Sequence, residues 1–143
     1  MSNATKTKIM GYHAIIEHIG AISHMDIAAL DALLRKAAFA ANATVLNADF
    51  HDFGDGAGNT GVLMLAESHI SIHTWPEDNY AAIDIFVCSD KESIENAISV
   101  LRHADDNGSF NYKILERMVR ANHIPLKNSN LITTGDASNA HNN

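Results

Sequence analysis

The residues with the greatest chemical potential stand in one short stretch, AESHISIHTWPE, at residues 66–77. It holds two histidines four positions apart, two serines and the one tryptophan of the chain. Three chemistries could use such a set: metal binding by the histidines, nucleophilic catalysis by a serine with a histidine base, or polar packing along a strand. The alternation of Ile70 and Ile72 with polar neighbours, followed by Trp-Pro, favours a strand.

Strand geometry separates the two histidines, His69 and His73. Residues four apart on a strand lie ~13 Å apart along its axis, which is too far to share one zinc ion at bonds of ~2 Å. A helix would bring such a pair together, but the isoleucine alternation does not fit a helix. We therefore expect no metal site in this stretch.

A serine hydrolase fits the residues no better. The flanks of Ser68 lack the G-x-S-x-G turn from strand to helix, and no neighbouring segment offers oxyanion donors. Taken singly, Ser68, His73 and Cys88 could each be a satisfied polar or thiol group on a strand. A hairpin at PEDN (76–79) would bring the strand of His73 beside that of Cys88, so that a histidine, a thiol and Trp75 converge.

Composition limits the classes of protein that fit. The chain has 143 residues, 46% of them apolar, which suits one domain with a proper core. Its formal net charge of -7 argues against a nucleic-acid partner. No apolar run approaches the ~18–20 residues that span a bilayer, and the N-terminus lacks the apolar core of a signal peptide. With a single cysteine, the expected compartment is the reducing cytoplasm.

Hydrophobic spacing outlines the elements that must position these residues. A helix capped by Asp26 is expected to run to about Ala41, and a second is expected from the capping box Ser89–Glu92 to about Ala104. The glycine-rich segment GDGAGN (54–59) predicts a loop, and it is not a phosphate loop because no Gly-Lys-Ser/Thr follows. Strands are expected over 8–22, 43–53, 61–75, 79–88 and 110–119, with the third continuous through SHISIHTW and the last able to end as a helical turn.

The resulting order, β-α-β-β-β-α-β, predicts an α+β fold. We expect a two-layer sandwich in which both helices cover one face of an antiparallel sheet. The other face would then meet a second copy of the chain. Residues 1–126 are expected to form one domain, and the polar segment 127–143 is expected to be a disordered tail.

The segment AESHISIHTWPEDNYAAIDIFVC (66–88) resembles the prokaryotic S-adenosylmethionine decarboxylase proenzymes. The motif of that family has the form ESH-x-(S/T)-IHTWPE-x-x-YAA-x-D-x-F-x-C, matched here without a gap. GYH (11–13), ATV (43–45) and HDF (51–53) add further matches in the family's order. The loop 54–59 is one residue longer than the family's usual loop, and Asp78-Asn79 replaces its usual aromatic or glycine.

The resemblance implies that the chain makes its own cofactor. The Glu67–Ser68 bond would break autocatalytically, giving residues 1–67 and 68–143, with Ser68 converted into a covalent pyruvoyl group. His73 matches the histidine that assists this processing. Thr60 stands where the family commonly has a serine, and its hydroxyl would support the same step. The pyruvoyl group would form a Schiff base with the substrate amine and act as an electron sink during decarboxylation.

The resemblance also implies the remaining site residues and the assembly. Cys88 matches the acid that reprotonates the substrate α-carbon. Glu77 matches the residue that binds the ribose hydroxyls, Phe53 matches the aromatic that stacks on adenine, and Trp75 would help to shape the pocket. The expected assembly is a dimer of cleaved protomers.

Two other interpretations stay open at this point. The same pyruvoyl chemistry could act on a basic amino acid such as ornithine or arginine, with Asp52, Asp55 and Asp78 holding the distal cation. The chain could instead be an inactive relative that regulates an active copy, although the intact Glu67 and Ser68 argue against it. The leading expectation is S-adenosylmethionine decarboxylase, which supplies the aminopropyl donor for spermidine biosynthesis.

Overall fold

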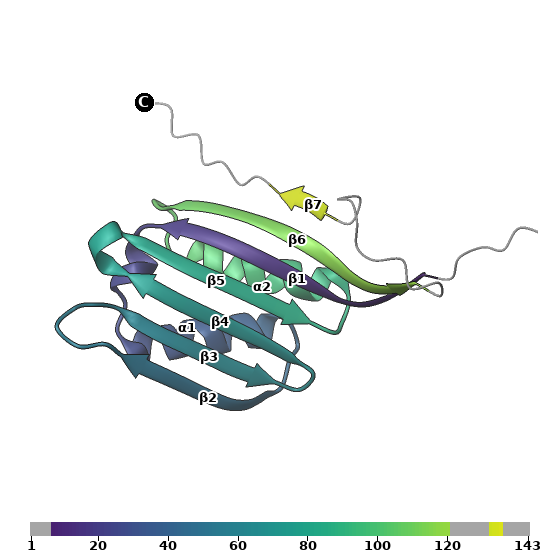
Figure 1. The fold of residues 1–143 in the computed structure, drawn as a ribbon, viewed down its shortest axis with the longest axis horizontal. Helices are drawn as coiled ribbons and strands as arrows, with labels where there is room; N and C mark the ends of the chain where they lie inside the picture. The colour runs from purple at the N-terminus through teal and green to yellow at the C-terminus, as the bar shows by residue number, and fades with distance from the viewer. Residues whose placement is uncertain (1–6, 121–131, 136–143) are drawn as a thin grey trace, which may run out of the picture.

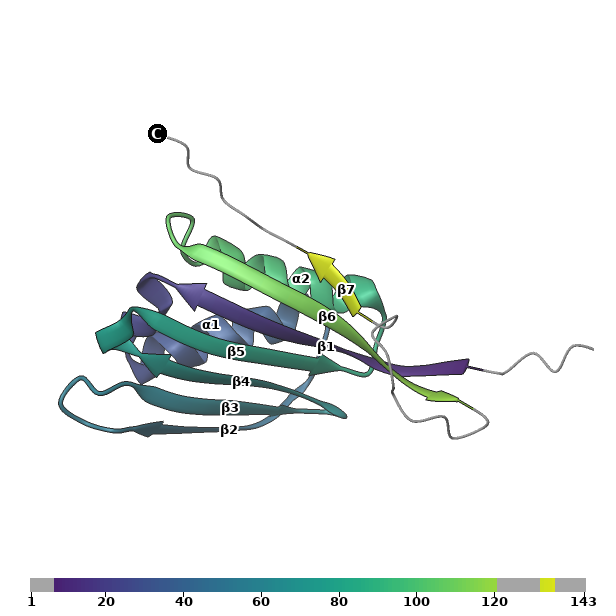
Figure 2. The ribbon, with the colours of Figure 1, turned by 45° about the horizontal axis from the view of Figure 1, so that its top comes forward.

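The computed structural model describes residues 7–120 and 132–135, which form an antiparallel sheet with two α-helices against one face (Figure 1). The strands follow the order β2-β3-β4-β5-β1-β6-β7 across the sheet. Figure 2 shows α1 and α2 on one face of the sheet, and among the described residues no helix or strand covers the other face. The elements are β1 (Thr7–Ile19), α1 (Ile27–Ala40), β2 (Val45–Asp52), β3 (Asn59–Leu65), β4 (Ser68–Trp75), β5 (Tyr80–Val87), α2 (Lys91–His103), β6 (Ser109–Arg120) and β7 (Ile132–Gly135), with short 3₁₀ turns η1 (Ala21–His24) and η2 (Pro76–Asp78). The predicted α+β two-layer sandwich is confirmed.

The core lies between the helices and the covered sheet face. Along β4 and β5 every second residue is buried, as the alternation predicted. The helices contribute one apolar stripe each, because their buried residues recur three and four positions apart. The largest fully buried apolar side chains are Ile16, Ile22, Leu30, Leu34, Leu63, Leu65, Ile70, Ile72, Ile85, Ile94 and Leu101.

The expected single strand over 61–75 is wrong. The chain turns at Ala66 and Glu67, so that β3 and β4 form a hairpin closed by the pair Leu65 and Ser68. The apolar run and the alternating run were each typical of a strand, and their junction contains no glycine, proline or asparagine to signal a turn. The sheet therefore has two strands where one was predicted, and Ser68 is the first residue of β4.

The first helix starts where the sequence predicted, and the second helix starts one residue later than predicted. The Asp26 carboxylate accepts from the Ala29 backbone N–H at 2.8 Å, as expected of a cap. The second helix is capped by Asp90 and not by Ser89, because Asp90 directly precedes the first helical residue and accepts from the Ser93 N–H at 2.9 Å. The last predicted strand stays a strand throughout β6, with no helical turn.

The C-terminal segment differs from the prediction over four residues. Residues 132–135 form β7, which pairs with Tyr112–Leu115 of β6. An edge strand offers free backbone N–H and C=O groups, and β-branched residues such as Ile132 and Thr133 suit such pairing. The rest of the predicted tail 127–143 lies outside the described residues. Among the described helices, none is both long and apolar enough to cross a bilayer.

A buried histidine on β1 links the sheet to the loop before β6. His18 is fully buried, and its Nε2 lies 3.2 Å from Oδ2 of Asp105. Burial lowers the pKa of His18 below its ordinary value, while the charge of Asp105 offsets part of this effect. The folded protein therefore takes up this proton less readily than the unfolded chain does.

This difference predicts an acid-sensitive contribution to stability. The contribution of His18 is fully present above its ordinary pKa of ~6.5 and is lost as the pH falls from there through the lower folded-state value. The free energy of unfolding in urea, measured from about pH 8 to about pH 5, should fall more steeply for the unmodified chain than for His18→Phe. Equal slopes for the two proteins would contradict the assignment.

Candidate active site

The bond predicted to break lies in a two-residue hairpin turn of an unfavoured kind. Glu67 is exposed and has φ 60, whereas Ala66 is not among the residues with positive φ. The favoured turns for two-residue hairpins need positive φ at the first loop residue, or at both. A glutamate in the left-handed region therefore carries the scissile carbonyl in a conformation that L-residues adopt at a cost of ~1–3 kcal/mol.

Cys88 lies beside this turn. Its thiol donates to the Glu67 carbonyl oxygen at 2.6 Å, and its backbone N–H donates to Ser68 Oγ at 3.2 Å. One residue thus contacts both reacting groups of the predicted cleavage: the carbonyl that would be attacked and the hydroxyl that would attack. Glu67, Ser68 and Cys88 line one cavity of about 200 Å³.

The other predicted site residues gather at the opposite end of β4. Thr60 Oγ1 and His73 Nδ1 lie 3.1 Å apart on the neighbouring strands β3 and β4. Both line a cavity of about 360 Å³ together with Phe53, Trp75 and Glu77. All five residues of this second group were named from the sequence, and the structure brings them together.

The loop before β3 reaches this cavity through a glycine. Gly58 has φ 101, and a Cβ there would collide with the carbonyl oxygen of Thr74. The backbone therefore passes close to β4, where the Asn59 backbone N–H donates a hydrogen bond to Thr74 Oγ1 at 2.8 Å.

One wall of the cavity is held from β1. The Tyr80 hydroxyl donates to the Glu17 carboxylate, and this hydrogen bond, with burial second, raises the pKa of Tyr80 to about 12. The Tyr80 ring in turn stacks on Trp75 with centroids 5.4 Å apart. The orientation of Trp75 is thus fixed by a tyrosine that stays protonated at any physiological pH.

The expected convergence of His73 with Cys88 does not occur within one chain. In the β4–β5 register His73 pairs with Ala82, while Cys88 lies beside the turn at the other end of the pair. The five residue steps from Ser68 to His73 span about 17 Å along a strand. The single chain therefore holds two groups, a cleavage group (Glu67, Ser68, Cys88) and a pocket group (Phe53, Thr60, His73, Trp75, Glu77).

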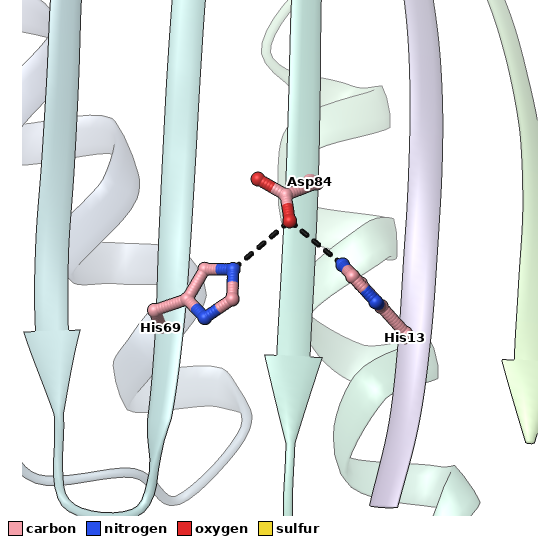
Figure 3. A group of neighbouring side chains, drawn as sticks. All are labelled: His13, His69 and Asp84. Carbon is pink, nitrogen blue, oxygen red and sulfur yellow. Dashed lines mark hydrogen bonds and ion pairs between the residues drawn. The ribbon is translucent and has the colours of Figure 1, made fainter. Parts of the chain in front are cut away.

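A third cluster, which the sequence did not predict, lies between these groups on the open sheet face (Figure 3). Asp84 Oδ2 accepts from His13 Nε2 at 2.7 Å and from His69 Nε2 at 2.9 Å, and Ser71 donates to Asp84 Oδ1. These four residues come from β1, β4 and β5, with β5 between the other two strands. Among the described residues, this is the group whose ligand atoms lie close enough to hold a metal ion.

The hydrogen bonds assign this cluster as a donor–acceptor network. Arg117 Nη1 lies 3.1 Å from His13 Nδ1, and because a guanidinium can only donate, that nitrogen accepts and Nε2 of His13 carries the hydrogen given to Asp84. Burial opposes ionisation of Asp84, but the hydrogen bonds from His13, Ser71 and His69 outweigh it and hold the pKa of Asp84 below its usual range. Asp84 is therefore an anion with three donors.

A model of the S-adenosylmethionine decarboxylase family matches residues 12–118, a range that contains all three clusters. The chain belongs to that family. Among curated members, the S-adenosylmethionine decarboxylase proenzyme of Parasynechococcus marenigrum is 48% identical over 100 residues, covering 66% of this chain and 74% of that protein. The proenzyme of a Sulfurihydrogenibium species is 40% identical over 116 residues, covering 78% and 85%.

A solved structure from the same family has a similar fold. The adenosylmethionine decarboxylase of Aquifex aeolicus superposes with a TM-score of 0.70 and 27% identity, covering 85% of this chain and 98% of that one. The resemblance found in the sequence is thus confirmed for the family.

Two of the three aspartates predicted to hold a distal cation, Asp52 and Asp55, lie beside the pocket group. Asp52 and Asp55 line a separate cavity of about 300 Å³ with Asp26, and Asn59 borders both this cavity and the pocket group. Asp78 lies in η2 and is not among the lining residues. Two of the three aspartates that were predicted to bind a distal cation therefore share one cavity in this member of the S-adenosylmethionine decarboxylase family.

Proposed function

We propose that the chain is a self-cleaving, pyruvoyl-dependent decarboxylase that acts on S-adenosylmethionine and supplies the aminopropyl donor for spermidine biosynthesis. The observation that carries this proposal is the pair of contacts from Cys88 to Glu67 O and Ser68 Oγ. They place a donor on each oxygen whose charge changes when a serine attacks the preceding peptide carbonyl. The family membership and the names of the relatives support the substrate.

The cleavage begins with attack of Ser68 Oγ on the carbonyl carbon of Glu67. The thiol of Cys88 donates to the oxygen that becomes negative, while the strained turn favours departure from the planar amide. The C–N bond breaks, its nitrogen takes a proton, and an ester joins Glu67 to the side chain of residue 68. Loss of the residue 68 α-proton to a base then expels the Glu67 carboxylate, and hydrolysis releases ammonia and leaves a pyruvoyl group.

The residues around Ser68 fit such a group. Ser68 is half-buried at the start of β4, and its cavity opens beside an exposed thiol. When formed, the pyruvoyl group supplies an electron sink for the carbon that loses CO₂. Cys88 is the residue of the cleavage group that carries a transferable proton, so we assign to it the reprotonation of that carbon.

The pocket group would hold the nucleoside end of the substrate. Phe53 is 60% exposed, which leaves its ring face free to stack on adenine. Glu77 offers carboxylate oxygens to the ribose hydroxyls. Trp75 closes the side of the same cavity, and the contact of Thr60 with His73 orients the imidazole that would serve as the base during cleavage.

We also propose that the working unit is a homodimer. The cleavage group and the pocket group both belong to the proposed reaction, yet they lie about 17 Å apart along one strand. A second copy laid against the open face would bring the pocket group of each protomer to the cleavage group of the other. The apolar residues of that face support such burial: Ile15 and Val62 are each 40% exposed and Met64 is 55% exposed.

Two further expectations belong to this proposal. The exposed lone cysteine carries chemistry that needs a free thiol, so we place the enzyme in the reducing cytoplasm. Residues 1–126 form its single domain in this scheme.

One observation favours a second candidate substrate. The cavity that holds Asp52 and Asp55 lies next to the pocket group, where carboxylates could bind the distal ammonium or guanidinium of a basic amino acid. Ornithine or arginine is therefore the alternative substrate for the same chemistry.

The test combines a denaturing gel with CO₂ release. The purified chain should appear as fragments of residues 1–67 and 68–143, and it should release labelled CO₂ from S-adenosylmethionine and not from ornithine or arginine. Ser68→Ala should stay full-length and inactive, since the attacking oxygen is gone. Release from a basic amino acid alone would select the second candidate, and a full-length unmodified chain would indicate an inactive regulatory relative.

A further inference from the structure

Three side chains of the kinds that bind metal ions converge on the open face of the sheet (Figure 3). His13 Nε2 lies 2.7 Å and His69 Nε2 lies 2.9 Å from Oδ2 of Asp84, and the three atoms all lie within 4.8 Å of one another. The expected absence of a metal site rested on the distance between His69 and His73 along one strand. It does not extend to His13 and Asp84, which meet His69 through the order of the strands.

The register of the strands places the two imidazoles on either side of one residue. His13 of β1 and His69 of β4 both pair with Phe86 of β5, and Asp84 stands two positions before Phe86 on the same face. The Phe86 ring stacks on His69 with centroids 6.1 Å apart and meets His13 edge to face at 5.6 Å. Gly11 leaves room for this ring, because a Cβ there would lie 2.8 Å from Phe86 Cζ. The two histidines are thus held in position beside the carboxylate.

The distances in this group suit a metal ion with bonds of ~2.0–2.2 Å. Ligand atoms around a tetrahedral ion at such bonds lie about 3.3 Å apart, so each imidazole needs to move from the carboxylate by only about 0.5 Å. Imidazole nitrogen combined with carboxylate oxygen suits zinc, whereas magnesium and calcium are bound through oxygen. Ser71 donates to Oδ1 of Asp84, which leaves Oδ2 to the histidines.

We propose that His13, His69 and Asp84 form a zinc site, in which Zn²⁺ replaces the two hydrogens that the imidazoles donate to Asp84 Oδ2. Each imidazole then carries its hydrogen on Nδ1 and binds the ion through Nε2, so no proton is gained or lost. The fourth position of the ion is left to water. None of the three ligands belongs to the cleavage group or the pocket group, so the site does not depend on the proposed reaction.

Arg117 opposes this exchange of hydrogens for zinc. Its guanidinium donates to Nδ1 of His13 and thereby keeps the hydrogen of that imidazole on Nε2. Zinc requires the reverse arrangement, because a ligating histidine donates its other N–H to an acceptor. The Arg117 side chain is exposed and can turn into solvent when the ion binds, which lowers the affinity.

Titration of zinc against a chromophoric chelator tests the site. The unmodified chain and the Ser68→Ala chain should each bind one Zn²⁺ there, whether or not the chain cleaves itself. His69→Gln and Asp84→Asn should each weaken this binding at least about 100-fold, because each removes one of three ligands. His103→Gln is the matched control: His103 Nδ1 also lies 3.1 Å from an aspartate oxygen, of Asp106, and its loss should leave the zinc affinity unchanged.

Cobalt gives a second measurement on the unmodified chain, and melting curves without metal verify that each variant is folded. Bound Co²⁺ should show the visible absorption of a four-coordinate ion without a thiolate charge-transfer band. A thiolate band would assign the ion to Cys88. Equal zinc affinity in the unmodified chain, His69→Gln and Asp84→Asn would assign it to other histidines, of which the chain has nine in all. Either result, or the absence of binding, would overturn the site.

Replacement of Arg117 should strengthen zinc binding. Arg117→Gln removes the guanidinium and offers an amide oxygen to the Nδ1–H of His13, so the affinity should rise about tenfold. Lys113→Gln, on the same strand, removes an equal charge and should raise the affinity less. A gain confined to Arg117→Gln supports the exchange at Nε2, since a purely structural network would show none. No gain, or equal gains in the two variants, would overturn it.

One consequence of the site rests on the proposed function. His13 belongs to residues 1–67, whereas His69 and Asp84 belong to 68–143, so one ion would bind both peptides after cleavage. Zn²⁺ should therefore raise the melting temperature of the cleaved protein and leave that of cleaved His69→Gln unchanged. A chain that binds zinc but stays full-length would support the site and overturn the proposed cleavage alone.

Discussion

Co-expression of Ser68→Ala and His73→Ala chains should restore cleavage that neither variant shows alone. In a mixed dimer, one site combines the intact Ser68 of the His73→Ala chain with the intact His73 of the Ser68→Ala chain. The second site lacks both groups. We therefore expect fragments from the His73→Ala chain only, and decarboxylation by at most one site per mixed dimer.

Different affinity tags on the two chains make the result readable on one denaturing gel. The control is co-expression of two differently tagged Ser68→Ala chains, which should stay intact. Cleavage of His73→Ala expressed alone would show that its imidazole is not required. An uncleaved mixed dimer, verified as mixed by sequential tag purification, would show that the two groups act within one chain or not at all.

Replacing Cys88 by alanine should affect both reactions. The thiol contacts the Glu67 oxygen, so its removal takes a donor from the developing negative charge and should slow cleavage. Decarboxylation by the fragments that do form should fall by about 10²–10⁴, the usual contribution of a positioned general acid. The cleavage rate is followed on gels after synthesis, and turnover is measured per mole of cleaved chain.

Cys88→Ser is the matched variant for this experiment. Its hydroxyl can still donate to the Glu67 oxygen, so cleavage should stay near that of the unmodified chain, while turnover should fall because a hydroxyl releases its proton far less readily than a thiol. Equal cleavage rates in Cys88→Ala and Cys88→Ser would show that the contact with Glu67 has no part in processing.

The sheet faces and the helical layer could be predicted from the sequence because each depends on local periodicity. Alternation fixed which residues of β4 and β5 point inward, and Asp26 marked the first helix. The turn at Glu67 could not be found this way, since glutamate carries no turn signal and its conformation is imposed by the pairing of β3 with β4. The same turn is the feature on which the proposed cleavage depends.

The Asp84 network escaped prediction for a different reason. Its members are separated by up to 71 positions in the chain and meet only because β1 lies beside β5. His13 and Asp84 stand in the segments GYH (11–13) and YAAID (80–84), which match the family motif without indicating that the two side chains meet. The one usable signal was the presence of polar residues at open-face positions of three strands, and it acquires meaning only when the strand order is known.

The strand order also determines how the protein would hold together after the proposed cleavage at Glu67–Ser68. Residues 1–67 contribute β1, β2 and β3, and the second fragment contributes the other strands. Because β1 lies between β5 and β6, three junctions join the two fragments: β3–β4, β5–β1 and β1–β6. The strands of the two peptides are interleaved in one sheet, so neither peptide can separate without breaking the backbone hydrogen bonds of these junctions. After the proposed cleavage, a subunit that unfolds would have to reassemble from two separate peptides. The cleaved protein could then not refold by the route that is open to the uncut chain.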